Sequence, residues 1–238
     1  MRPLLLALLV CAAPARAQVV SLTIPLDRAP EAPRLDGRAW AELGAVVLTG
    51  AGHLAASEAG VSNLYIPVVI AGWGGYVGAR ALDDPGVLAE LGFRGENLGR
   101  AARDVGLVSA AAAAGMAVYG VANGSTMAEP SLVPLLVLYP AWGLTQQMLV
   151  QGFVTRHLAA AGLPALAVAP MTAVTFGSVH VPNWPLTAAT TALGGAFAPL
   201  YLRDGNLWPL GVAHGALGAL FYVWVLDEDP WAEALGQE

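Results

Sequence analysis

The chain has 238 residues, of which 56% are hydrophobic and 12% are charged, and its formal net charge is −6. Soluble domains carry roughly 25% charged residues, so the composition excludes a soluble globular enzyme, and it also excludes a disordered chain. The acidic balance and the lack of any arginine cluster exclude nucleic-acid binding, and the single cysteine excludes a disulfide framework. The composition therefore indicates an integral membrane protein.

The N-terminal residues differ from the rest of the chain. Residues 1–17 combine an early arginine, an apolar run and Ala15-Arg16-Ala17, which is the form of a signal peptide. We interpret them as a signal peptide or an uncleaved first anchor. Residues 18–60 follow as an N-terminal leader. The proline-rich part, 18–41, is expected to be extended and solvent-facing, and 43–57 is expected to form a short apolar helix of undecided depth.

Residues 61–226 hold the stretches that are apolar enough to cross a membrane. A spanning helix needs about 20 mainly apolar residues. The predicted spans are Val61–Ala79, Asp104–Val121, Ser131–Val154, Leu163–Val181, Leu186–Leu202 and Leu207–Leu226. The predicted fold class is therefore all-α, a polytopic transmembrane bundle of about six to eight helices. Residues 227–238 are expected to form an acidic tail.

Arginine placement predicts the orientation of these spans. If the spans alternate, every arginine beyond residue 60 falls on one side of the membrane: Arg80, Arg94, Arg100, Arg103, Arg156 and Arg203. Arginine-rich loops face the cytoplasm, so this side is predicted to be cytoplasmic, with Glu129 and Asp227–Asp229 outside. The leader then lies outside, unless 43–57 also crosses and brings it inside. We expect a bacterial-type cytoplasmic (inner) membrane.

Five polar side chains within the apolar spans are candidate functional groups, because amides and imidazoles at membrane depth are costly. They are Gln146, Gln147, Gln151, His180 and His214. Gln147 and Gln151 are four residues apart and are expected to share a helix face. The structural alternative is that the amides join helices by hydrogen bonds of ~0.6–2 kcal/mol each. Because unpaired donors are unfavourable in hydrocarbon, we expect all five to face one interior cavity.

Three sequence pieces, in this order, resemble a known family. Leu91-Gly92-Phe93-Arg94 resembles an upstream cytoplasmic segment, Phe176-x-x-x-His180 matches a Phe-x-x-x-His motif, and Arg203-Asp204-Gly205-Asn206 leads to a third motif at His214. The chain thereby resembles the CPBP family, which comprises CAAX prenyl endopeptidases and bacteriocin-processing, Abi-type intramembrane proteases. The resemblance implies a CPBP-like helical core. It also implies a membrane-embedded peptide or a lipid-modified protein as the partner.

The family's first motif, Glu-Glu-x-x-x-Arg, is altered here to Gln146-Gln147-Met148-Leu149-Val150-Gln151. In that family a glutamate activates the attacking water, and the histidines orient that water or stabilise the oxyanion. An amide has no useful basicity, and losing a general base costs about 10²–10⁴-fold in rate. The resemblance implies catalytic positions at His180, His214, Gln146 and Gln147. It implies binding positions at Gln151, Phe176 and Gly218, where Gly218 replaces the family's polar partner.

These departures favour a non-catalytic or weakly active relative that binds a membrane-embedded peptide or a lipid-linked partner. One alternative is an active intramembrane endopeptidase that uses His180 and His214 with another base, although no acidic residue in the predicted spans that carry the motifs replaces the glutamates. A second alternative is a small transporter or channel, although the paired broken half-repeats of transporters are missing. Glutamine is a poor metal ligand beside imidazole, so no cofactor is expected, and a divalent metal at the two histidines is the weaker alternative.

Overall fold

A computed structural model of the chain describes residues 35–229. The predicted signal peptide, most of the leader and most of the acidic tail lie outside this range. The described part is helical and has no strand, which confirms the predicted all-α fold class. The elements are α1 (Gly37–Glu58), α2 (Ser62–Asp83), α3 (Val87–Leu91), α4 (Leu98–Asn123), α5 (Leu132–Gln147), the π-helix η1 (Met148–Thr155), α6 (Arg156–Ala160), α7 (Ala165–Ser178), α8 (Trp184–Asp204), α9 (Leu207–Phe221) and the π-helix η2 (Tyr222–Leu226).

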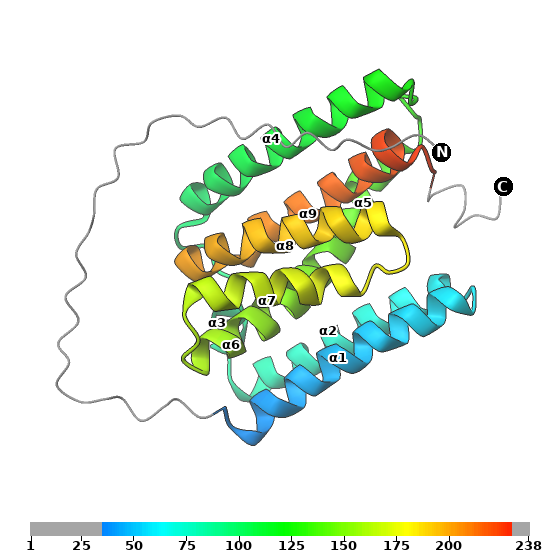
Figure 1. The fold of residues 1–238 in the computed structure, drawn as a ribbon. Helices are drawn as coiled ribbons and strands as arrows, with labels where there is room; N and C mark the ends of the chain where they lie inside the picture. The colour runs from blue at the N-terminus through cyan, green and yellow to red at the C-terminus, as the bar shows by residue number, and fades with distance from the viewer. Residues whose placement is uncertain (1–34, 230–238) are drawn as a thin grey trace. The chain divides into compact units, whose positions relative to one another are not determined.

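The helices pack in pairs around α5 and α9 (Figure 1). Helix α9 packs on both α4 and α5, α7 pairs with α8, and α1 pairs with α2. The π-helix η1 continues α5 and contacts α1 and α7, so it joins the α1–α2 hairpin to the rest of the bundle. Every predicted span falls on a helix of this arrangement.

Three segments are long and apolar enough to cross a membrane: Leu98–Asn123, Leu132–Ala160 and Leu207–Leu226. They contain three of the six predicted spans. Helix α7 has 14 residues and is therefore about 21 Å long, which is shorter than the ~30 Å hydrocarbon core. Crossing by α2, α7 and α8 stays a prediction.

Helix starts are fixed by local capping. The Asp36 side chain accepts a hydrogen bond from Ala39 N at 2.8 Å and starts α1 at Gly37, so 37–41 is helical where an extended chain was expected. The Asn206 side chain accepts from Trp208 N at 3.2 Å and starts α9. Because of the first cap, α1 has 22 residues and is longer than the predicted helix over 43–57.

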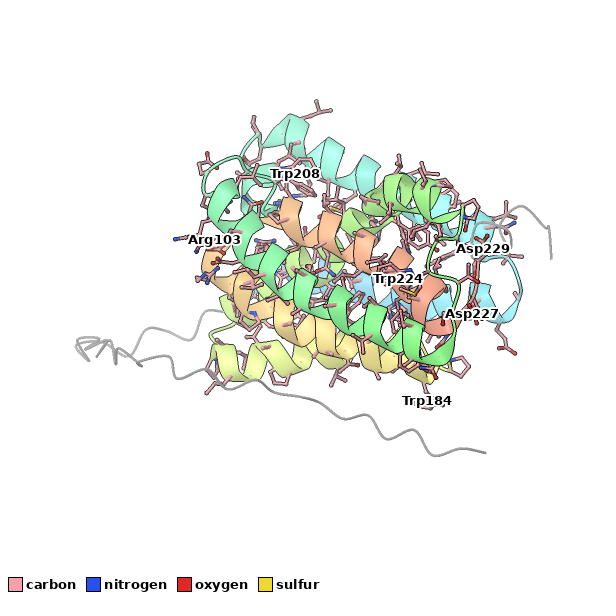
Figure 2. All side chains as sticks on the ribbon, turned by 90° about the horizontal axis from the view of Figure 1, so that it is seen from above. Arg103, Trp184, Trp208, Trp224, Asp227 and Asp229 are labelled. Atoms are coloured by element: carbon pink, nitrogen blue, oxygen red, sulfur yellow. The ribbon has the colours of Figure 1, made fainter. Side chains whose placement is uncertain are left out.

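The arginines gather at one end of the bundle. Arg80 and Arg156 both contact Glu90, and Arg203 contacts Asp104, so loops far apart in sequence lie together. Figure 2 shows Arg103 at one end of the helices and Asp227 and Asp229 at the other. This geometry agrees with the predicted one-sided distribution of positive charge.

Helix α1 starts at the arginine end, because its Glu42 contacts Arg80 and Arg156 there. The main expectation put the leader opposite the arginines, and this is wrong for Gly37–Glu42. The physical reason is that the apolar stretch at 43–57 belongs to a long helix that runs away from the arginine end and pairs with α2. The start of α1 at the arginine end is the arrangement expected if residues 43–57 cross the membrane.

Helices α5 and α9 come into close backbone contact through glycines. A Cβ atom at Gly143 would lie 2.5 Å from the carbonyl oxygen of Gly211, and one at Gly215 would lie 2.5 Å from Pro140 N. Real Cβ atoms do not approach so closely, so only glycine allows this backbone contact. His214 lies between the two α9 glycines and is held against α5.

We predict that Gly215→Ala destabilises the protein by about 1–3 kcal/mol, because the added methyl overpacks against the α5 backbone. The matched control is Gly218→Ala in the same helix, where the nearest atom is Tyr139 Cδ2 at 3.7 Å. This control should be neutral or slightly stabilising, since alanine favours helix over glycine. Thermal unfolding in detergent measures both, and equal midpoints for the two variants would contradict the proposed close contact.

We also predict that the arginine end faces the cytoplasm, because positive loops are retained there. In a background with Cys11→Ser, Glu129→Cys should react with a membrane-impermeant maleimide on intact cells, and Arg103→Cys should react only after lysis. The reverse labelling pattern would show the opposite orientation.

Candidate functional site

The α5–α9 contact brings the first and third motif positions together. Gln147 lies one turn after Gly143 and is fully buried, and its Nε2 lies 3.2 Å from His214 Nδ1. With the amide nitrogen as donor, Nδ1 of the imidazole accepts, so the ring proton lies on Nε2. The Gln147 Oε1 atom has no hydrogen-bond partner among the described residues. The site therefore holds a neutral amide–imidazole pair, and the Gln147 Oε1 atom remains as an unused hydrogen-bond acceptor.

Gln151 takes part in a different set of hydrogen bonds. It is fully buried, and its Oε1 accepts from Thr155 Oγ1 at 2.8 Å, while Thr155 Oγ1 also lies 2.8 Å from Thr172 Oγ1 of α7. Gln147 and Gln151 therefore have different hydrogen-bond partners, and the chain passes from α5 into the π-helix η1 between them. Within 35–229 no partner satisfies Gln151 Nε2.

Phe176 of α7 links the two candidate histidines. Its buried ring meets His180 edge-on with centroids 5.3 Å apart, and it meets His214 edge-on with centroids 5.1 Å apart. His180 Nδ1 donates to the Phe176 carbonyl at 2.9 Å. The Nε2 atom of a neutral His180 is then left as an acceptor. The second motif thus places its phenylalanine against both imidazoles.

Gln146 faces another direction from Gln147, as expected for adjacent helix residues about 100° apart. It lines a cavity of about 310 Å³ between the α1–α2 hairpin and the α5–α7 part of the bundle, which Phe176 also lines. Gly218 lies against Tyr139, with 3.7 Å between its Cβ position and that ring. The five polar side chains therefore do not all meet in one cavity, although the Gln147–His214 contact and Phe176 connect most of them.

The donor set does not fit a metal ion. The Nδ1 atoms of His180 and His214 both make hydrogen bonds inside the protein, and Phe176 packs against both rings. No group of three or more histidine, cysteine, aspartate or glutamate residues suited to a metal occurs in the described range. Amide nitrogens and aromatic carbons cannot complete such a site.

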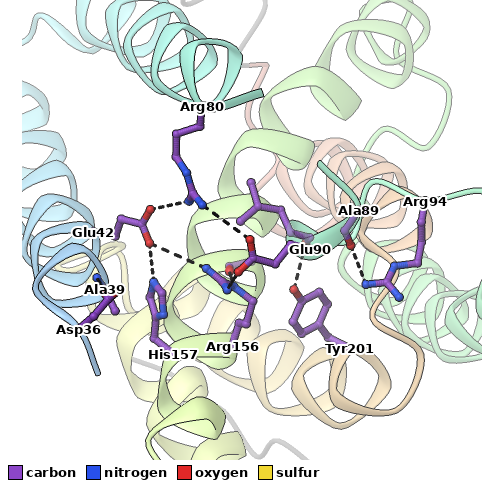
Figure 3. Close-up of polar contacts among 12 residues, drawn as sticks. Asp36, Ala39, Glu42, Arg80, Ala89, Glu90, Arg94, Arg156, His157 and Tyr201 are labelled. Atoms are coloured by element: carbon purple, nitrogen blue, oxygen red, sulfur yellow. Dashed lines mark hydrogen bonds and ion pairs between the residues drawn. The ribbon is translucent and has the colours of Figure 1, made fainter. Parts of the chain in front are cut away.

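A buried glutamate that sequence reasoning did not consider lies at the arginine end (Figure 3). Glu42 is 4% exposed and contacts Arg80 Nη1 at 2.7 Å and Arg156 Nη2 at 3.8 Å. Both arginines also contact Glu90. We name these four residues the ion ring. Two further groups donate to Glu42: Tyr76 Oη at 2.5 Å and His157 Nε2 at 2.7 Å.

The ion ring ties the N-terminal hairpin to the bundle. Its members come from α1, α2, α3 and α6, and opposite charges alternate around it. Removing one member of a buried ion pair leaves its partners uncompensated in a poorly solvated place. The signal available in the sequence was an acidic residue at the start of an apolar stretch, on the side where the arginines gather.

Two pieces that carried the family resemblance are in contact at the same end. Leu207 N donates to the Gly92 carbonyl at 2.8 Å, and Asn206 Nδ2 donates to the Arg94 carbonyl at 3.0 Å. Gly92 has φ +106° and lies so close to Gly205 that a Cβ would be 2.9 Å from its carbonyl oxygen. The turn after α3 therefore fixes where α9 begins.

Asp204, the last residue of α8, is held by arginines. Hydrogen bonds from Arg203, strengthened by the nearby Arg100, keep the pKa of its carboxyl below the ordinary value. A carboxyl whose pKa is lower in the folded state stabilises the fold above its unfolded pKa. This contribution is lost as the pH falls through the folded value.

The fold and these contacts define a helical integral membrane protein with a polar core between α5, α7 and α9. Residues 128–220 match the family described as type II CAAX prenyl endopeptidase Rce1-like. This match agrees with the CPBP resemblance over the segment that holds the motif positions from Gln146 to Gly218, and this segment of the membrane protein is CAAX-protease-like. No curated protein and no solved structure matches the chain.

We predict that Glu42→Gln lowers the free energy of unfolding by about 3 kcal/mol, because two arginines then share one remaining carboxylate. Glu58→Gln is the matched control, since Glu58 is exposed at the other end of α1 and its substitution should change stability by at most about 0.5 kcal/mol. Chemical denaturation in detergent measures both. Equal stability of the two variants would show that the ion ring does not hold the hairpin.

Proposed function

We propose that this protein is a non-catalytic CAAX-protease-like membrane protein that binds a membrane-embedded peptide or a lipid-modified protein in a bacterial-type inner membrane. The observation that carries the proposal is Gln147, which occupies the position of a family glutamate and contacts His214 at 3.2 Å. The Gln147–His214 contact supports a role in binding a ligand. Hydrolysis needs a general base, and the amide of Gln147 cannot act as one.

The buried carboxylates do not supply another base at this place. Within the described chain, the buried acidic residues are Glu42 and Asp204. Both pair with arginines at the arginine end. His180 and His214 are instead surrounded by amide and aromatic groups. A histidine without a base or a metal partner can orient a carbonyl by hydrogen bonding, which is a binding role.

The peptide as partner is supported by the unpaired polar atoms of the site. Gln147 Oε1 and Gln151 Nε2 are buried and lack partners, one being an acceptor and the other a donor. Buried polar groups are unfavourable unless they are hydrogen-bonded, so each of these two atoms would be satisfied by a partner of its own from a ligand or a water. A peptide backbone offers both a donor and an acceptor.

The test is binding and cleavage measured on the same purified protein. The probe is a fluorescent peptide that ends in a farnesylated cysteine followed by three residues. We expect saturable binding in nanodiscs with no cleavage. Cleavage that disappears in His180→Ala or His214→Ala would establish the peptidase instead, and absence of binding would refute the proposal.

A gain-of-function variant tests whether the missing base accounts for inactivity. Gln146→Glu and Gln147→Glu restore the carboxylates, while Gln151→Arg and Gly218→Asn supply a counter-charge and an oxyanion donor. A neighbouring imidazolium favours the ionised carboxylate. Each new charge at membrane depth costs ~2.5–3.5 kcal/mol unless it is paired, so lower stability should accompany detectable cleavage. A folded fourfold variant without any cleavage would show that more than the base has been lost.

A further inference from the structure

The cavity beside Gln146 has one wall that comes from outside the family-matched segment. Gly50 of α1 lies so close to α7 that a Cβ there would be 2.8 Å from Val179 Cγ1. This close approach sets α1 beside the residue that precedes His180. The α1–α2 hairpin thereby forms a wall of the cavity opposite Gln146 and Phe176.

His53 lies one turn after Gly50 on the same face of α1 and lines this cavity. Its ring centroid is 6.2 Å from that of Tyr65. The Nδ1 atom of His53 is buried and has no hydrogen-bond partner among the described residues. His53 thus lines an apolar space and carries a buried nitrogen without a partner.

The four hydroxyl groups of the lining are already hydrogen-bonded inside the protein. The hydroxyl donors and their acceptors are Thr49 to Ala45 O, Tyr65 to Thr49 O, Thr175 to Met171 O and Ser178 to Thr175 O. The lining contains no charged side chain. Three polar side chains of the described lining therefore remain for a ligand: His53 on α1, and Trp142 and Gln146 on α5.

We propose that His53 is a ligand-binding residue of this protein: with Gln146 on the opposite wall, it holds one neutral amide group of a peptide whose apolar side chain fills the cavity. The proposal rests on the proposed peptide-binding function. An imidazole and a carboxamide each donate and accept, which matches the N–H and C=O of an amide. A carboxylate or a phosphate would be buried here without a cation, which is unfavourable.

The test measures the affinity of an amide probe in nanodiscs. The probe is N-acetyl-trileucine amide carrying a fluorophore, and decanoate serves as an anionic competitor. We expect the natural protein to bind the probe and decanoate to compete poorly. His53→Leu and Gln146→Leu should each weaken binding about three- to tenfold, the loss expected for one hydrogen bond.

Two further variants separate hydrogen bonding from packing. His53→Asn keeps a donor and an acceptor in a smaller side chain, so it should recover part of the affinity lost in His53→Leu. Asn63→Leu changes an exposed polar residue of the same hairpin and should bind as the natural protein does. Thermal unfolding midpoints close to that of the natural protein show that the variants are folded.

Each other outcome overturns the inference. Unchanged affinity in His53→Leu shows that His53 only fills space, and competition by decanoate as strong as that of unlabelled trileucine amide shows that the site does not select an amide. If the farnesylated peptide binds but the trileucine amide does not, this inference fails while the proposed function stands. If neither binds, both fail.

Discussion

The arrangement of the polar core depends on the backbone contact between α5 and α9. Gly143, Gly211 and Gly215 lack the Cβ atoms that would push these helices apart, so the two backbones meet directly. His214 lies within this contact and reaches Gln147, and Phe176 of α7 then packs on the His214 ring. In a membrane, where lipid is as apolar as the helix surfaces, such close packing and the polar contacts it permits drive helix association.

Glutamine in place of glutamate keeps the shape of this core and removes its charge. An amide and a neutral imidazole share a hydrogen bond without placing an ion at membrane depth, where a charge is costly. The Gln147–His214 pair can therefore persist in an apolar bundle without the wetted surroundings that a carboxylate needs. An amide also has no useful basicity, so the property that allows uncharged burial is the one that keeps this side chain from accepting a proton.

Helix periodicity and motif spacing in the sequence predicted two features of the structure, the helices and one polar contact of the core. Apolar stretches marked the helices, and the motif positions led to the Gln147 and His214 contact. The pattern did not give the partners of Gln151, because its Oε1 pairs with Thr155, which in turn contacts Thr172 on another helix. It also missed Glu42, whose partners Arg80 and His157 lie 38 and 115 residues further along the chain. No local periodicity reports side chains that pair across such separations, and the role of His53 likewise appears only once α1 is set against α7.

The ion ring has a consequence for the order in which the chain is assembled during synthesis. Glu42 leaves the ribosome long before Arg156 and His157, yet it reaches the membrane with Arg80 following in the same hairpin. The α1–α2 hairpin can therefore enter the membrane with Glu42 already paired to Arg80, before the later helices are synthesised. When α6 arrives, its arginine and histidine complete the shell around a carboxylate that is already in position. The α1–α2 hairpin would thus be in place first, and the family-matched segment would pack against it.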